Sequence, residues 1–366
     1  MKLFLDLNYH FFSEKNIDLI YKKYNANFGY LEHLKDTLNV ISLFQTSFKE
    51  EKKEDNLRVI AHKGRSLKKI DYPNKIHKKI LQMNPDYILI HGLRYGLYSF
   101  FIKRKLKNVV ILVQVHGYAK SPSGIKKKLY QWAQKYVDGY LFTGNKNAQS
   151  WIDSDTIPER KIFEVMEGSI NFPDNVKVEK EKNTFLWVGR LIASKDPILV
   201  LNAFEEYLNT NPLAKLEMVF NSYDLIDEVR EKINKSTSLK NNVSLIGELD
   251  KKSLEKLYLK NQFFITGSHY EGSGYALLES MAYGCIPIIT KIPSHEFMTG
   301  YGNCGFLYNV KNQNELVNTL RNLNQIDIKK EKEKVYNQFI ERLSFRAIAE
   351  DIYTIFDKIA KNKGYV

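Results

Sequence analysis

The chain has 366 residues, of which 43% are hydrophobic and 27% charged, enough for two domains with cores of their own, and this composition excludes a mainly disordered protein. Its two cysteines, Cys285 and Cys304, show no paired Cys/His spacing, which argues against a disulfide framework or a structural zinc site and favours a reducing cytosol. The longest uncharged apolar run, at 109–115, is too short to cross a bilayer.

The net charge of +13 is carried almost wholly by the first half of the chain. Residues 1–180 contain 31 Lys and Arg against 19 Asp and Glu, whereas residues 181–366 contain 24 against 23. A basic half could bind an anionic membrane, a nucleic acid or an acidic substrate. Alternatively, its charges only form a solvated surface. No nucleic-acid-binding module is recognisable, so we expect no nucleic-acid partner. The runs 103–105 and 126–128, the second beside Tyr130 and Trp132, favour an anionic membrane surface.

Short apolar runs alternate with helix-period segments through the first half. We predict strands at 3–8, 40–44, 57–61, 86–90, 109–115 and 139–142, helices at 70–83, 95–106, 125–137 and 148–152, and a charged loop at 49–55. Strands that alternate with helices indicate a parallel sheet covered on both faces.

A polar stretch at 171–183 marks a domain boundary, after which the alternation restarts. We predict strands at 184–188, 216–220, 243–246, 263–265 and 286–289, and helices at 196–208, 226–233, 253–259, 275–283, 313–323, 328–339 and 345–360. The fold class is therefore α/β, with two doubly wound domains at 1–175 and 176–345.

The most informative stretch runs from Ser268 to Pro287. It places a tight loop, Glu271-Gly272-Ser273-Gly274, between an apolar strand and a helix. This arrangement aims unpaired backbone N–H groups and the positive end of a helix dipole at one spot, which suits a diphosphate. Glu279 lies a little over one turn into that helix, where it could meet a ligand hydroxyl. A Gly-x-Gly turn before a helix is also common without any ligand.

Two further signals lie at the ends of predicted strands. Gly189 and Arg190 end the strand at 184–188, and Lys195 follows, so that two cations could neutralise a leaving diphosphate without a metal. They could equally be a solvated pair beside a helix start. His116 ends a strand of the first half, but His91 repeats that pattern, and sequence alone does not choose between them.

One Asp-x-Asp pattern, Asp153-Ser154-Asp155, invites a metal site. It follows a short amphipathic stretch and precedes Pro158. We therefore predict a surface loop there and no metal site.

Four segments, taken in order, resemble glycosyltransferase family 4, whose members are retaining nucleotide-sugar transferases of the GT-B fold. They are Val188–Leu191 with Lys195, Val243–Leu249 with Leu254–Tyr258, the Glu-x7-Glu spacing from Glu271 to Glu279 that continues to Pro287, and Asn303–Leu307. The first half matches only in layout. The resemblance implies two Rossmann-like domains facing across a cleft, the first completed by the C-terminal helix at 346–366, and no metal or other cofactor.

The resemblance also implies roles for individual residues. Arg190 and Lys195 would hold the donor diphosphate, Glu271 the donor sugar, Glu279 the ribose hydroxyls, and His116 would contact the sugar near its anomeric carbon. The departing phosphate is thought to help deprotonate the acceptor on the same face, so configuration is retained. The rest of the donor site would comprise Gly189, Gly247, Glu248, Gly272, Ser273, Gly274, Tyr275, Ala276 and Leu277.

Three segments depart from the family pattern. Asn8–Phe12 stands where the family has a Gly-Gly loop, Asn221–Tyr223 where it has Gly-x-Gly, and Asp196 where a Gly follows the lysine. We expect a hexosyltransferase that moves a sugar from a UDP- or GDP-sugar to a saccharide or lipid-linked acceptor in polysaccharide or glycolipid synthesis. It would work in the cytoplasm or at the inner face of the membrane. The alternative is a non-catalytic nucleotide-sugar-binding protein.

Overall fold

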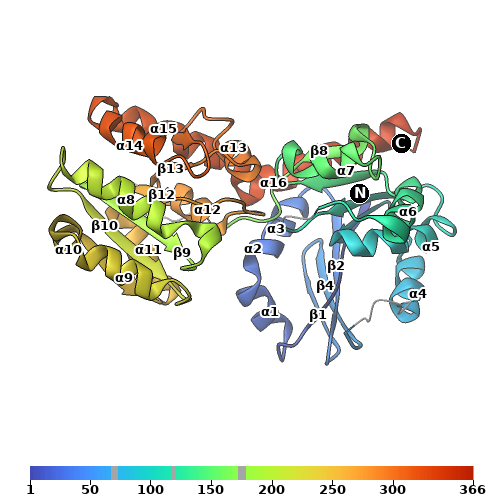
Figure 1. The fold of residues 1–366 in the computed structure, drawn as a ribbon. Coiled ribbons are helices and arrows are strands. Elements are labelled where there is room, and N and C mark those ends of the chain that lie inside the picture. Colours follow the sequence, from blue (N-terminus) through green and yellow to red (C-terminus); the bar gives the residue numbers. More distant parts are fainter. Residues whose placement is uncertain (67–72, 118–119, 172–178, 366) are drawn as a thin grey trace. The chain divides into compact units, whose positions relative to one another are not determined.

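The computed structural model describes residues 1–66, 73–117, 120–171 and 179–365 (Figure 1). The chain divides into two compact units. Unit 1 is Met1–Ile170 with Phe345–Val366, and unit 2 is Asn171–Ser344. The boundary predicted between residues 175 and 176 lies outside the described residues.

Unit 1 is built on an eight-stranded sheet with the order β3-β4-β2-β1-β5-β6-β7-β8. All its pairings are parallel except that of β3 with β4, which is an antiparallel hairpin at the edge. The strands are β1 Leu3–Phe12, β2 Asn39–Thr46, β3 Glu50–Glu54, β4 Leu57–Lys63, β5 Tyr87–His91, β6 Val110–Gln114, β7 Gly139–Phe142 and β8 Ile162–Glu164.

Helices accompany this sheet between its strands and at the end of the chain. They are α1 Ile17–Lys23, α2 Asn25–Phe28, α3 Leu31–Leu34, α4 Asn74–Met83, α5 Ser99–Lys103, α6 Gly124–Ala133, α7 Gln149–Asp153 and α16 Phe345–Asn362, with 3-10 segments η1 Leu93–Tyr98, η2 Gln134–Tyr136, η3 Asn145–Ala148 and η4 Glu159–Lys161.

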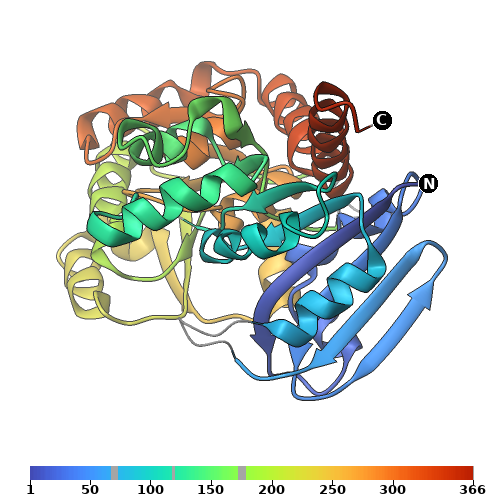
Figure 2. The same ribbon diagram turned by 90° about the vertical axis from the view of Figure 1, so that its right-hand side faces the viewer.

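The central strand β1 buries both of its faces because successive side chains alternate across a strand. On one face, Tyr9 contacts α4 (light blue in Figure 2), where its hydroxyl lies 2.8 Å from Nε2 of His77. On the other face, Phe4 meets Phe356 of α16 edge-on, with ring centroids 5.6 Å apart. Phe356 also stacks on Tyr87 of β5. The last helix is therefore part of the core of unit 1.

Three local predictions for the first half were wrong. Residues 8–12 continue β1 through a register shift between Asn8 and Phe11 and do not form a loop. The charged segment 49–55 contains edge strand β3, whose side chains are largely solvated, so charge there does not prevent pairing. The segment 95–106 contains the end of η1 and the short helix α5, not one continuous helix.

Unit 2 is built on a six-stranded parallel sheet with the order β11-β10-β9-β12-β13-β14. Its strands are β9 Glu181–Gly189, β10 Lys215–Phe220, β11 Val243–Gly247, β12 Asn261–Thr266, β13 Ile286–Thr290 and β14 Phe306–Tyr308. Its helical segments are α8 Pro197–Leu208, α9 Ile226–Asn234, α10 Thr237–Asn242, α11 Lys251–Lys260, α12 Tyr275–Ala282, α13 Pro293–Met298, α14 Gln313–Asn322, α15 Ile328–Gln338, η5 Ala193–Lys195, η6 Leu323–Gln325 and the π-helix η7 Phe339–Leu343.

The centre of unit 2 is an aromatic cluster under α8. Phe185 of β9 stacks on Phe263 of β12, with ring centroids 4.9 Å apart. Phe204 of α8 packs edge-on against Phe185. These side chains are buried. Because β9 and β12 are parallel neighbours, this core brings their carboxyl ends, and the loops that follow, to one edge of the sheet.

We predict that Phe356→Ala destabilises unit 1 by about 3–5 kcal/mol, because it removes a fully buried ring that packs against two strands. The measurement is the free energy of unfolding in a denaturant titration. Lys358→Ala, at an exposed position of the same helix, is the control and should change the stability little. A loss below 1 kcal/mol for Phe356→Ala would contradict the packing described for α16.

Candidate functional site

The loops after β9 and β12 are locked together at the carboxyl edge of the unit 2 sheet. The backbone N–H of His269 donates to the carbonyl of Ser194 at 2.8 Å. At Gly267 the two backbones lie so close that a Cβ there would be 2.9 Å from the carbonyl oxygen of Asp196. A glycine is therefore required at 267, and the two loops form one rigid floor.

Asp196 explains one departure from the family pattern. Its backbone is left-handed, with φ 43° and ψ 57°, a conformation in which glycine is favoured and aspartate tolerated. Its Oδ1 accepts from the N–H of Leu199 and so caps α8. Its Oδ2 lies 2.8 Å from Nε2 of His269. One side chain thus begins α8 and also fastens the neighbouring loop.

Lys195 and Glu271 form an ion pair between the two loops. Oε1 of Glu271 also accepts from the hydroxyl of Ser268 at 2.8 Å, and the Glu271 carbonyl accepts from Ser294 at 3.2 Å. Both side chains of the pair keep part of their surface exposed, 18% for Lys195 and 17% for Glu271. An incoming anion can therefore reach Lys195, but it must compete with Glu271 for the ammonium group.

The amino end of α12 is open. Gly274 is its N-cap, in a left-handed conformation with φ 59°, and no side chain caps the first turn. The first N–H groups of the helix are therefore available to an anion, and the helix dipole favours negative charge there. A Cβ at 274 would lie 3.8 Å from Nε2 of His295. Burial lowers the pKa of His295 to about 4, so this ring is neutral and adds no cation.

A pocket of about 300 Å³ lies at this edge of the sheet. Its lining comes from the ends of β9 and β10, the segment after β11, and helices α11 and α12. The lining residues are Val188, Gly189, Arg190, Lys195, Val219, Phe220, Asn221, Glu248, Leu249, Leu254 and Ala276. We call it the β9–α12 pocket.

Five of the residues predicted from the sequence line this pocket, namely Gly189, Arg190, Lys195, Glu248 and Ala276. Arg190 is exposed and, within the described parts of the chain, has no ion-pair partner, in contrast to Lys195. The two predicted cations therefore differ: Arg190 can take an anion directly, whereas Lys195 must first leave Glu271.

The other predicted donor residues of unit 2 lie outside the lining of this pocket. Gly272 and Gly274 belong to the loop before α12, where Ser273 is buried and Tyr275 is exposed. The side chain of Leu277 is buried in the core, so only its backbone could meet a ligand. Gly247 ends β11.

Glu279 points toward α11. Its Oε2 accepts from the hydroxyl of Tyr258, 3.1 Å away, and burial raises the pKa of this carboxyl group although the Tyr258 hydrogen bond lowers it. Glu279 also lies outside the pocket lining. A ribose that reached this carboxylate would have to share it with Tyr258.

In unit 1, His116 lies just beyond the end of β6 and both of its ring nitrogens are engaged. Nδ1 lies 2.8 Å from Oε2 of Glu167, and Nε2 lies 3.0 Å from Nδ1 of His91. His91 in turn contacts Asp6 of β1 at 2.5 Å. The two histidines between which sequence could not choose therefore belong to one hydrogen-bonded chain.

Sequence reasoning missed several of these residues. Asp6 and Glu167 complete the histidine chain, and Phe220 lines the β9–α12 pocket. Asn221 and Leu254 also line it; their segments were named from the sequence, but they were not counted among the donor residues. A signal existed for Asn221, because it directly follows a strand at the carboxyl edge. For Asp6 the signal was an acidic residue within an apolar predicted strand, because a buried acid needs hydrogen-bonding partners.

Two other features lie away from this edge. Asp153 and Asp155 are exposed, as a surface segment requires, although Asp153 ends helix α7. Among the residues that the structure describes, no group of three or more His, Cys, Asp or Glu is placed to hold a metal ion. The absence of a metal requirement stays a prediction.

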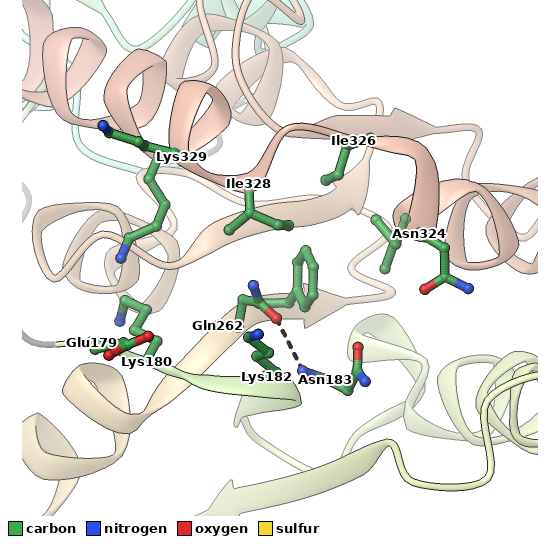
Figure 3. A pocket seen from close by; sticks show the side chains of 12 residues that line it. Glu179, Lys180, Lys182, Asn183, Gln262, Asn324, Ile326, Ile328 and Lys329 are labelled. Carbon is green, nitrogen blue, oxygen red and sulfur yellow. Dashed lines mark hydrogen bonds between the residues drawn. The ribbon is translucent and has the colours of Figure 1, made fainter.

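A larger pocket, of about 480 Å³, lies at the opposite edge of the sheet, where β9 and β12 begin (Figure 3). Lys182, Lys329 and Gln262 are among its lining residues, and Oε1 of Gln262 accepts from the N–H of Asn183 at 3.0 Å. Because ligands of open parallel sheets bind at the carboxyl ends of the strands, this pocket is not the candidate site.

Residues 170–342 match the family model of glycosyl transferases group 1. Relatives named as glycosyltransferases agree with this match, which covers slightly less than half of the chain. The narrower prediction of family 4 is not decided by it.

Two curated relatives illustrate the similarity. A GDP-mannose:cellobiosyl-diphosphopolyprenol alpha-mannosyltransferase of Xanthomonas oryzae pv. oryzae is 29% identical over 126 residues, 34% of this chain and 33% of that protein. The capsular polysaccharide biosynthesis glycosyltransferase CapH of Staphylococcus aureus is 26% identical over 250 residues, 64% of this chain and 68% of CapH. The alignment with the Xanthomonas protein thus spans about a third of its length.

Solved structures share the fold. A glycosyltransferase from Rickettsia africae superposes with a TM-score of 0.70 at 18% identity, over 99% of each chain. TarM of S. aureus, in a complex with UDP, fondaparinux and alpha-GlcNAc-glycerol, gives a TM-score of 0.55 at 17% identity, over 77% of this chain and 58% of TarM. The predicted fold class, α/β with two Rossmann-like domains as in GT-B glycosyltransferases, is confirmed.

We predict that Asp196→Ala lowers the stability of unit 2 by about 1–3 kcal/mol, because alanine loses the α8 cap and is strained in the left-handed conformation. Asp196→Asn keeps a capping oxygen and tolerates that conformation, so it should cost much less. Denaturant unfolding of both variants checks this, and equal losses for Ala and Asn would refute the capping role.

Proposed function

We propose that this protein is a retaining glycosyltransferase that moves a hexosyl group from a UDP- or GDP-sugar to a saccharide or lipid-linked acceptor. Cell-surface polysaccharide or glycolipid synthesis is the proposed setting, by analogy with the relatives named above. The observation that carries the proposal is the edge of unit 2, where Arg190, Lys195 and the open amino end of α12 occur together within a segment that matches group 1.

The chemistry suits a diphosphate leaving group. Arg190 can hold phosphate oxygens with two parallel N–H bonds, and Lys195 can add a point charge once it leaves Glu271. In the transfer, the acceptor oxygen bonds to the anomeric carbon while the bond from that carbon to the diphosphate oxygen breaks. The acceptor proton passes to the departing phosphate. Cationic groups that stabilise the charge on the diphosphate lower the barrier of this step.

The freed Glu271 carboxylate has a use of its own. When Lys195 turns to the diphosphate, Oε1 keeps only the hydrogen bond from Ser268 and can accept from a sugar hydroxyl. Donor binding would thus exchange one ion pair for a phosphate contact and a sugar contact. No metal has a part in this scheme.

We expect Arg190→Ala to weaken the binding of UDP or GDP by about 10- to 100-fold, since a charge-assisted contact contributes about 1.5–3 kcal/mol. Isothermal titration with both nucleotides measures the effect. Arg230→Ala, at an exposed position of α9 in the same unit, is the matched control and should bind like the parent protein. Equal affinity for the parent and Arg190→Ala would end the proposal for this site.

Turnover distinguishes the enzyme from the alternative, a non-catalytic nucleotide-sugar-binding protein. Donor hydrolysis and transfer are measured with a panel of UDP- and GDP-sugars beside the binding titrations. Binding without turnover for every donor and acceptor would favour the alternative. A donor that is consumed, with loss of turnover in Arg190→Ala, supports the transferase.

We further propose that unit 1 docks on an anionic membrane surface through α6. Ile125, Leu129 and Trp132 are 80%, 48% and 39% exposed and follow the spacing of one helix face. Lys126 and Lys128 on the same helix are exposed beside them. Apolar side chains that enter the interface next to lysines are typical of helices that lie on lipid. No helix in the described ranges has the length and apolarity to cross a bilayer.

We predict that Ile125→Glu reduces sedimentation with vesicles of phosphatidylglycerol and phosphatidylcholine by several-fold, because it puts a repelled charge in the exposed apolar face. Leu213→Glu changes a side chain that is 77% exposed in unit 2 and should have no effect. Binding that does not depend on the anionic lipid, or is equal in both variants, would contradict the proposed docking.

A further inference from the structure

Four side chains of unit 1 form an uninterrupted chain of hydrogen bonds. Asp6 of β1 meets His91 of β5, His91 meets His116 after β6, and His116 meets Glu167 after β8. The contact distances are 2.5 Å from Asp6 Oδ1 to His91 Nε2, 3.0 Å from His91 Nδ1 to His116 Nε2, and 2.8 Å from His116 Nδ1 to Glu167 Oε2. The two imidazole rings are nearly parallel, 19° apart. We call these four residues the Asp6–Glu167 relay.

The ends of the relay are held by further donors. Asp6 accepts from the Tyr30 hydroxyl at 2.7 Å and from the Ser42 hydroxyl at 2.8 Å. Glu167 also accepts from the N–H of Gly117 at 3.1 Å. Both carboxyl groups therefore accept hydrogen bonds on more than one side.

A count of hydrogens fixes the protonation of the relay. Each of its three links needs one hydrogen, whichever partner carries it. Two neutral imidazoles and two carboxylates supply only two, because a neutral imidazole has one N–H. In that state the central link would join two lone pairs at 3.0 Å. A relay in which all three links are hydrogen bonds therefore holds one additional proton.

The members of the relay differ in exposure. Asp6 and His91 are buried, whereas the side chain of His116 is 29% exposed, so protons can enter and leave at the His116 end. A further basic group, His10 near the end of β1, faces the pair and opposes an extra positive charge. Partial burial, and then the charges of His116, His91 and Arg94, lower the pKa of His10.

We propose that the Asp6–Glu167 relay holds one proton beyond those of two neutral imidazoles, and that loss of this proton breaks the His91–His116 link. Nε2 of His116 then becomes a free acceptor at the exposed end of the relay. Asp6, His91 and Glu167 are positioning residues that act through His116. The freed nitrogen is then available to a hydroxyl group, and its use in transfer rests on the proposed function.

The first test counts ring protons in the full-length protein with ¹⁵N-labelled histidine and no added nucleotide. Long-range ¹H–¹⁵N spectra over a pH titration should show three protected ring protons for His91 and His116 at the low-pH end of the range in which the chain is folded. As pH rises, one proton is lost, from His91 Nδ1 or His116 Nε2, and two remain. Only two ring protons at every pH at which the chain is folded would overturn the relay.

Glu167→Gln removes the negative charge beside His116 but keeps an oxygen that can accept from Nδ1. It should move the loss of the third proton to lower pH, because the negative charge that favours a charged imidazole is gone. Glu159→Gln, at an exposed position of η4, is the matched control and should leave the transition in place. Asp6→Asn tests the buried end of the relay and should act in the same direction. A transition that is unmoved in both folded relay variants contradicts the proposal.

The pH profile of kcat/KM links the relay to the reaction. The pH at which kcat/KM changes should coincide with the pH at which the third proton is lost. In Glu167→Gln both should move to lower pH, an effect that a merely structural glutamate would not cause. Silent transfer assays with three ring protons present would reject the proposed function and leave the relay standing. An active enzyme with only two ring protons at every pH would support the proposed function and reject the relay.

Discussion

The close backbone contact between Gly267 and Asp196 is the constraint on which the candidate donor site depends. It is possible only because β9 and β12 are parallel neighbours whose carboxyl ends meet at one edge of the sheet. Once the two loops touch, the other contacts follow. His269 reaches Asp196, Lys195 reaches Glu271, and the amino end of α12 opens toward the same edge. Residues more than 70 positions apart in the sequence thus act as one surface.

The ion pair between Lys195 and Glu271 neutralises one of the two cations that line the site. Because both side chains keep part of their surface exposed, a ligand can reach the pair and compete for it. A diphosphate carries more negative charge than one carboxylate, so it can displace Glu271 from the ammonium group. Arg190 has no such competitor among the described residues. It can therefore make the first contact, with Lys195 following.

The sequence was sufficient for the features that depend on local pattern. Strand and helix alternation predicted both sheets, and strand-end glycines next to Arg190 and Glu271 predicted the edge at which the site lies. It failed where tertiary contacts decide. Residues 8–12 continue β1 because Tyr9 and Phe12 find buried places beside β2 and α4, although the segment has no strong strand pattern. The edge strand β3 is stabilised by its partner β4 and not by apolar residues of its own.

The Asp6–Glu167 relay shows the same limit at the level of single side chains. Its successive members are 85, 25 and 51 residues apart along the chain, so no sequence motif could predict that they meet. What brings them together is the order of the sheet, in which β1, β5 and β6 are successive neighbours and each ends near the same edge. His116 alone would be an ordinary strand-end histidine. With His91 behind it and a carboxylate at each end, it belongs to the relay for which we propose one shared proton, and in that relay the two acids can offset the repulsion that a charge would meet between two adjacent imidazoles. The hydrogen-bond partners of His116, and hence the reactions open to it, are therefore set by the order of the strands and not by the histidine alone.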